Sequence, residues 1–161
     1  PFAQADPLSA VGLAFSLDLQ DLQIMSELFE FGKTILASQP FSVMLGTELE
    51  IFEPGTAVLT LAVHDELKQQ HGFIHGGVVS YLADNALTYA GGSVLGDSVT
   101  SEYKINYLRP ALGKKLIAKA TVLSSGKNQA VCQCIVTAIG DDGERTVAVA
   151  QGTINKVSPK I

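Results

Sequence analysis

The chain of 161 residues lacks several features that mark large classes of proteins. Only 11 lysines and arginines stand against 16 aspartates and glutamates, which gives a formal net charge of −5, and no basic cluster is present. This balance argues against nucleic acid as a partner. No apolar run approaches the length of about 20 residues that spans a bilayer. We therefore expect neither nucleic acid nor a membrane among the partners.

Cysteine is also scarce, with two residues in the whole chain, Cys132 and Cys134. Because they are two positions apart in a strand pattern, they should point to the same face. We interpret them as small buried residues in a reducing compartment, in preference to a disulfide or a metal pair. The first residues show no basic segment followed by an apolar block, so we expect no signal peptide and a cytoplasmic location.

The signatures of several common enzymes are missing as well. The sequence contains no GxxxxGK or GxGxxG phosphate loop and no G-x-S-x-G nucleophile elbow. His71 and His75 are four positions apart, as in a metal pair, but they fall in a predicted loop and no third ligand has convincing spacing. We therefore expect no bound metal.

What the chain does contain is enough apolar sequence for one domain. Its hydrophobic content is 47% and its mean hydropathy is +0.26. We predict an irregular N-terminal arm over residues 1–18 and a single domain over residues 19–161. The hydropathy is slightly high for a monomer, which suggests that some apolar surface is buried between subunits.

Hydrophobic periodicity predicts two helices and about six strands. One helix covers residues 19–37 and stops before Pro40, and a second covers residues 76–90 and is ended by Gly91-Gly92. The predicted strands are 45–52, 57–63, 98–107, 116–125, 130–139 and 146–155. This order indicates an α+β fold in which one antiparallel sheet wraps around the second helix, and the last four strands form a meander.

The segment before and within the second helix carries the chemistry. His75, Gly76 and Gly77 lead into it, and a helix start favours negative charge because its free N–H groups point outward. Asp84 lies inside the helix, and a buried acid is costly to keep. Together they suggest an oxyanion hole and a base. The structural alternative, in which Asp84 is merely held by Thr88 or by a loop, is less favoured beside the His-Gly-Gly sequence.

Helix geometry constrains how these groups can work together. Gly76 and Asp84 are eight residues apart, or roughly 12 Å along one helix. One reacting carbonyl cannot touch both, so cooperation requires two antiparallel copies of the helix. The spacing therefore predicts a homodimer with two composite sites. We expect the small and polar stripe that contains Gly77, Ser80, Tyr81, Asp84 and Thr88 to line the cleft.

These residues resemble a known family. His75-Gly76-Gly77, Leu82 and Asp84, together with Lys104–Ala111, which reads KINYLRPA, are similar to the hotdog-fold acyl-CoA thioesterases of the PaaI-like branch. The resemblance extends over about residues 45–155. It implies a hotdog fold and hydrolysis of a CoA-linked acyl or aryl-acyl thioester to the free acid and CoA. It also implies no cofactor, and a homodimer that pairs into a tetramer.

The resemblance also implies catalytic roles. Asp84 would be the nucleophile or the general base, and the Gly76 N–H would polarise the thioester carbonyl with help from the helix dipole. Gln69 would lie near the acyl carbonyl or the lytic water. His75 would position the thioester or its loop, and Thr88 would hold the water.

Four further residues are expected to contact the substrate: Gly77, Tyr81, Thr100 and Arg109. Thr100 would supply a hydroxyl according to the resemblance. Arg109 would meet CoA phosphates, although a solvated loop charge is the commoner role for such a residue. Many relatives carry Asn in place of Gln69 or Glu in place of Asp84, so the acyl group and the role of the carboxylate stay open.

Two other functions fit parts of the pattern. A non-catalytic acyl-CoA-binding module of the same fold usually lacks a competent acid and carries a DNA-binding domain, and this chain has the acid without a basic domain. An enoyl-CoA hydratase or dehydratase of the same fold uses a different pair of residues, for which the sequence shows no counterpart. We therefore favour the thioesterase.

Overall fold

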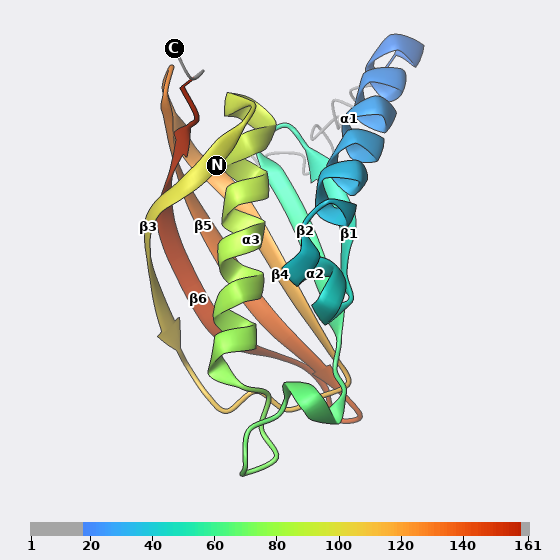
Figure 1. Cartoon of the computed structure of the whole chain (residues 1–161), viewed down its shortest axis with the longest axis vertical. Helices are drawn as coiled ribbons and strands as arrows, with labels where there is room; N and C mark the ends of the chain where they lie inside the picture. Colours follow the sequence, from blue (N-terminus) through green and yellow to red (C-terminus); the bar gives the residue numbers. More distant parts are fainter. Residues whose placement is uncertain (1–17, 159–161) are drawn as a thin grey trace, which may run out of the picture.

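The computed structural model describes residues 18–158 and is built around one long helix and one sheet (Figure 1). In chain order the elements of this part are α1 (Leu19–Ala37), α2 (Pro40–Leu45), β1 (Thr47–Glu53), β2 (Thr56–Ala62), the 3-10 turn η1 (Asp65–Leu67), α3 (Gly76–Leu95), β3 (Ser98–Tyr107), β4 (Lys115–Ser125), β5 (Gln129–Gly140) and β6 (Gly143–Lys156). The predicted arm over residues 1–18 lies outside the described residues except for Asp18.

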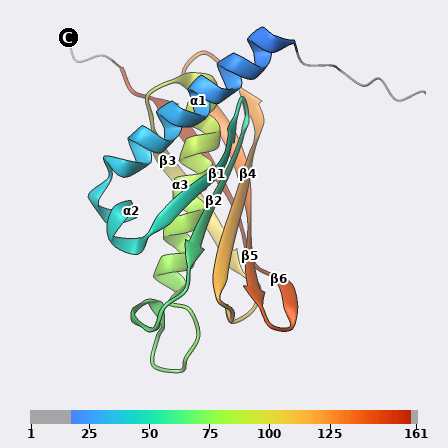
Figure 2. The same cartoon turned by 90° about the vertical axis from the view of Figure 1, so that its right-hand side faces the viewer.

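The six strands form an antiparallel sheet in the order β1-β2-β4-β5-β6-β3. Figures 1 and 2 show α3 lying along one face of this sheet, with α1 and α2 on the same side. The residues that α3 buries recur at helical spacing, among them Val79, Leu82, Ala83, Ala86, Leu87 and Ala90. The predicted α+β fold, with a sheet around a central helix and an N-terminal helix, is confirmed.

The predicted end of the central helix is wrong. Gly91-Gly92 does not end α3, which continues to Leu95 and is followed by Gly96 with a φ of 83°. Gly91 lies so close to β6 that an added Cβ would be 2.7 Å from the Cβ of Ile154. The glycine therefore serves close packing between helix and sheet and does not break the helix.

The predicted four-strand meander is also wrong, because it holds for β4, β5 and β6 only. β3 pairs with β6 over its whole length, from Ser98 opposite Lys156 to Tyr107 opposite Ala148. The chain then crosses to β4, which pairs with β2 on one side and β5 on the other. β3 is consequently an edge strand beside α3.

Two tight turns join neighbouring strands as hairpins. Glu53 pairs with Thr56 across the first turn, and Gly140 pairs with Gly143 across the second. Cys132 and Cys134 lie on β5, where both are buried and free. Burial raises the pKa of the Cys132 thiol to about 11 and that of the Cys134 thiol to about 12.

The helix α1 follows the predicted bounds and is capped by Asp18, whose carboxylate accepts the Asp21 N–H at 2.8 Å. It packs against β1 through Gly32, where an added Cβ would be 2.5 Å from the Phe52 ring. The buried hydroxyl of Tyr89 on α3 donates to the Gly32 carbonyl at 3.1 Å, and burial raises the pKa of that hydroxyl above its usual range. These contacts bind α1 to the core.

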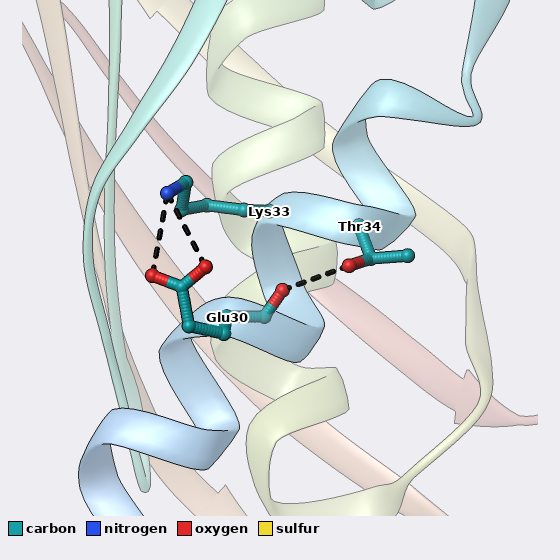
Figure 3. A network of polar contacts seen from close by, with 3 residues as sticks. All are labelled: Glu30, Lys33 and Thr34. Atoms are coloured by element: carbon teal, nitrogen blue, oxygen red, sulfur yellow. Dashed lines mark hydrogen bonds and ion pairs between the residues drawn. The ribbon is translucent and has the colours of Figure 1, made fainter.

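The outer surface of α1 carries ordinary helix contacts (Figure 3). Lys33 Nζ lies 3.3 Å from the Glu30 carboxylate, and the Thr34 hydroxyl donates to the Glu30 carbonyl at 3.0 Å. Because both charged groups are exposed, the pair contributes only a few tenths of a kcal/mol, roughly.

The short helix α2 was not predicted, since a strand was expected from residue 45. Pro40 occupies the first turn of α2, where its missing N–H costs nothing. Gly46, with a φ of 71°, ends the helix and turns the chain into β1. Among residues 18–158, no helix has the length and apolarity required to cross a membrane.

Candidate active site

The start of α3 is organised by His75. This residue is the N-cap, and its Nδ1 accepts the Gly77 N–H at 2.9 Å. A Cβ on Gly77 would lie 3.0 Å from that Nδ1, so glycine allows the ring to sit over the helix start. The imidazole thus satisfies one of the free N–H groups of the first turn and leaves the preceding one, on Gly76.

The Gly76 N–H has no acceptor within residues 18–158. Its carbonyl accepts the Tyr107 hydroxyl at 3.0 Å, which ties the helix start to the end of β3. Gly76 lines a hollow of about 440 Å³ together with Gln69, Tyr107 and Arg109. The structure therefore brings together three residues that the sequence analysis assigned separately: an N–H donor, an amide and a cation.

The loop before α3 is held in place by backbone hydrogen bonds. The His75 N–H donates to the Leu67 carbonyl at 2.8 Å, and the Ile74 N–H donates to the Ala111 carbonyl at 2.9 Å. Gln69 and Phe73 close a turn through a further bond of 2.8 Å. These contacts define the position of Gln69 relative to the helix start.

A second group of residues surrounds Asp84, which is half-buried between α3 and β3. The Thr100 hydroxyl donates to Asp84 Oδ1 at 2.7 Å. The Thr88 hydroxyl lies 2.6 Å from the Thr100 hydroxyl and 3.0 Å from the Asp84 carbonyl. An ionised carboxylate only accepts, so Thr100 gives its single proton to Asp84, and the Thr88 hydroxyl shares its proton between the Asp84 carbonyl and the Thr100 oxygen. The chain of hydroxyls stabilises the carboxylate and leaves Oδ2 without a partner among the described residues.

The predicted stripe on α3 divides into two directions. Ser80, Asp84 and Thr88 face β3, where the Ser80 hydroxyl lies 2.6 Å from the Tyr103 hydroxyl. Tyr81 faces α2 and β1 instead, and its hydroxyl bonds to Ser42 and other residues there. The structure therefore groups Thr88 and Thr100 with Asp84 but keeps the Tyr81 hydroxyl apart from them.

Several residues around these groups were missed by the sequence analysis: Ser42, Asn85, Tyr103 and Tyr107. Tyr107 belongs to the segment KINYLRPA, which is a signal that could have identified it, whereas Tyr103 is brought to α3 by a register shift in β3 that the sequence does not reveal. Ser42 lies on the unpredicted helix α2 and had no such signal.

Gly76 and Asp84 lie on one continuous helix, as predicted. Eight residues of α-helix separate them, which corresponds to roughly 12 Å. One chain therefore carries an N–H donor in one place and a held carboxylate in another. In residues 18–158, no cluster of three or more His, Cys, Asp or Glu residues is arranged to hold a metal ion.

Comparison with known proteins places these groups in a domain of a known family. The model of the thioesterase superfamily matches residues 71–144, a range that includes Gly76, Asp84 and Thr100. The chain is 31% identical to acyl-coenzyme A thioesterase PaaI of Escherichia coli over 118 residues. This alignment covers 73% of this chain and 82% of the relative. It is 29% identical to 1,4-dihydroxy-2-naphthoyl-CoA hydrolase of Listeria monocytogenes over 113 residues, an alignment that covers 68% of this chain and 89% of that relative.

Solved structures agree with these relatives. A thioesterase family protein from Silicibacter pomeroyi superposes with a TM-score of 0.75 at 32% identity, over 78% of this chain and 95% of that one. The PaaI protein of Escherichia coli gives a TM-score of 0.75 at 26% identity, over 83% and 96%. The hotdog architecture expected from the sequence is therefore confirmed, while α1 and α2 lie before the residues that match the family model.

Proposed function

The chain belongs to the thioesterase superfamily as a PaaI-like hotdog thioester hydrolase, and from this premise we propose that it hydrolyses acyl-CoA thioesters at Asp84, in a site shared by two copies of the chain. The products are the free acid and CoA. The observation that carries the proposal is the half-buried Asp84 carboxylate, whose Oδ1 is held by Thr100 while Oδ2 is left to react.

Asp84 acts as general base or as nucleophile. As a base, Oδ2 takes a proton from water while the water oxygen attacks the thioester carbonyl carbon. As a nucleophile, Oδ2 attacks that carbon and water later hydrolyses the mixed anhydride. In both routes the carbon–sulfur bond breaks and the CoA thiolate leaves. A thiol is a good leaving group because its ordinary pKa is about 8.5.

The negative charge that develops on the carbonyl oxygen requires a donor in place beforehand. The unpaired Gly76 N–H at the start of α3 is suited to this role, because the helix dipole adds to it and no reorganisation is needed. Gln69 lines the same hollow and supplies an amide for the carbonyl oxygen or for the water. His75 acts indirectly, by capping the helix so that the Gly76 N–H points outward.

The roughly 12 Å between Gly76 and Asp84 means that each site takes one group from each of two chains. The edge strand β3 is the surface we propose for the dimer. It pairs only with β6 within residues 18–158, and it carries exposed Val99 and Tyr107. An open strand edge favours pairing with another strand. Two β3 edges related by a two-fold axis would place two α3 helices antiparallel, with Gly76 of each facing Asp84 of the other.

Three further parts complete the proposal. Arg109 lines the hollow beside Gly76, so it is the cation we assign to the CoA phosphates. The buried free thiols Cys132 and Cys134 support a reducing compartment and hence the cytoplasm. Pairing of two dimers into a tetramer stays a prediction from the family resemblance.

The test is a rate measurement on the purified full chain with aryl-, short-, medium- and long-chain acyl-CoAs, in which release of the CoA thiol is followed with a thiol reagent. Turnover that is lost in Asp84→Asn supports the proposal. Tight binding of these compounds without thiol release would instead identify a binding module. Formation of a hydrated product from an enoyl-CoA would identify a hydratase.

A further inference from the structure

A polar network joins α2 to the face of α3 beside the candidate site. The Tyr81 hydroxyl donates to Ser42 Oγ at 2.7 Å, and Ser42 donates to Gln39 Oε1 at 2.6 Å. Asn85 Nδ2 donates to the Tyr81 oxygen at 3.2 Å, and Thr47 Oγ1 lies 2.9 Å from it. The single proton of Tyr81 is already committed to Ser42, so Thr47 is the donor in that last contact. The hydroxyl is therefore fully used and is unavailable for proton transfer.

The network turns one apolar side of α2 outward. The Phe41 ring packs edge-to-face on the Tyr81 ring, with centroids 5.0 Å apart and an interplanar angle of 89°. Met44 lies three residues later, on the same side of the helix. Phe41 is 54% exposed and Met44 68% exposed, although their neighbours Ser42 and Leu45 are buried. We call Phe41 and Met44 the α2 wall.

This wall begins close to the reactive carboxylate. Tyr81 and Asp84 are three residues apart on α3, which makes their side chains neighbours on its surface. Phe41 in turn touches Tyr81. Figures 1 and 2 show α2 beside α3 on the same side of the sheet. Tyr81 therefore links the α2 wall to the helix face that carries Asp84, with the Tyr81 hydroxyl directed towards α2 and β1 and the Asp84 carboxylate towards β3.

The charge of the surface restricts what it can accept. The segment from Gln39 to Thr47 contains no charged residue. An acyl group that ends in a carboxylate would find no cation in this segment to pair with. An uncharged hydrocarbon would instead bury apolar area against Phe41 and Met44.

We infer that the α2 wall selects an uncharged, apolar acyl group by packing against the end of that group farthest from the thioester. This inference rests on the proposed hydrolysis at Asp84 and adds its substrate class. The polar network under the wall holds α2 in position.

The test compares the full-length wild type with Phe41→Ala, Phe41→Leu and Val43→Ala. Val43 is also exposed but lies on the opposite side of α2, which makes it the matched control. The measured quantity is kcat/KM for acetyl-, butyryl-, hexanoyl- and octanoyl-CoA. We expect the loss in Phe41→Ala to grow with chain length and to reach about 10-fold for octanoyl-CoA, as expected when a pocket loses an apolar contact. Phe41→Leu should recover most of it, and Val43→Ala should leave the ratios within about two-fold.

A charged substrate gives a second readout. Succinyl-CoA and butyryl-CoA have the same number of acyl carbons, and only the former ends in a carboxylate. We expect the wild type to prefer butyryl-CoA by at least about 10-fold, and Met44→Lys to reduce this preference. Wild type that hydrolyses no acyl-CoA would refute the proposed function itself.

Turnover with an unchanged chain-length profile in Phe41→Ala would refute the α2 wall alone. An equal loss for all four substrates would do the same, because it would indicate a general structural effect. A weaker dimer with an unchanged profile, measured by sedimentation, would assign the surface to a second copy of the chain and also overturn the inference.

Discussion

The Thr100 hydroxyl reaches across from β3 to Asp84 on α3 and donates a hydrogen bond of 2.7 Å to one carboxylate oxygen. The Thr88 hydroxyl lies 2.6 Å from the Thr100 hydroxyl. This arrangement gives the two oxygens of Asp84 different tasks, since Oδ1 is held and Oδ2 is open. Thr100 contacts the carboxylate directly, whereas Thr88 reaches it only through Thr100, and the first two predictions use this difference.

Asp84→Asn should lower kcat by about 10²- to 10⁴-fold, because an amide at this position can neither accept a proton nor attack a carbonyl. The amide oxygen can still accept the Thr100 hydrogen bond, so the fold should survive. The checks are kcat with the preferred acyl-CoA and the thermal unfolding midpoint. A variant with a normal midpoint and a normal rate would exclude Asp84 as the reactive group.

Thr100→Val should lower kcat by about 10- to 100-fold, since a hydrogen bond to a charged group contributes roughly 1.5–3 kcal/mol. Thr88→Val should have a smaller effect, because Thr88 reaches the carboxylate only through Thr100. Thr100→Ser keeps the hydroxyl and serves as the control for packing. An effect of Thr88→Val as large as that of Thr100→Val would show that Thr88 binds the water or the substrate directly.

Gly91→Ala should destabilise the protein by about 1–3 kcal/mol, the usual cost of overpacking. The added methyl would lie 2.7 Å from the Cβ of Ile154, an atom fixed to the β6 backbone. Gly92→Ala is the matched control, since its methyl would meet only the Ser98 hydroxyl at 3.0 Å, which can rotate away. Urea unfolding measures both, and equal stabilities would contradict the close packing of α3 on β6.

The same glycine shows where sequence patterns lose information. A Gly-Gly pair ends many helices, and only the approach of β6 explains why this one continues through it. Asp84 and the start of α3 could be predicted because both depend on residues close together in sequence. Contacts that depend on distant strands could not, and β3 shows this most clearly.

The side of β3 that faces α3 cannot be derived from simple alternation. A register shift between Thr100 and Glu102 moves the strand by one residue, so that Thr100 and Tyr103 both contact α3 although they are three positions apart. The sequence resemblance suggested Thr100 but had no means of adding Tyr103. The network around Tyr81 was hidden for a related reason, because it depends on α2, a helix of six residues.

Gly76→Pro is the sharpest test of the oxyanion donor, since it removes the N–H and little else. Proline is well tolerated at the first position of a helix, and the preceding residue, His75, already has the extended conformation that proline requires (φ −60°, ψ 132°). We expect kcat to fall by about 10²- to 10³-fold. Gly76→Ala is the control, because it keeps the N–H and its methyl would meet the Tyr107 ring at an ordinary 3.6 Å. Similar losses in both variants would indicate that space, and not the N–H, is what the site needs.

Mixing two inactive variants decides whether the site is shared between chains. In a dimer of one Gly76→Pro chain and one Asp84→Ala chain, a composite arrangement puts both lesions in one site and leaves the other site intact. Random exchange makes half of the dimers mixed, and half of their sites are whole, so about a quarter of the wild-type activity should return. Each variant alone, treated in the same way, is the control. If Gly76 and Asp84 served one site within a single chain, every site would carry a lesion and the mixture would stay inactive; a bent or broken α3 would then be required to bring the two groups together across roughly 12 Å.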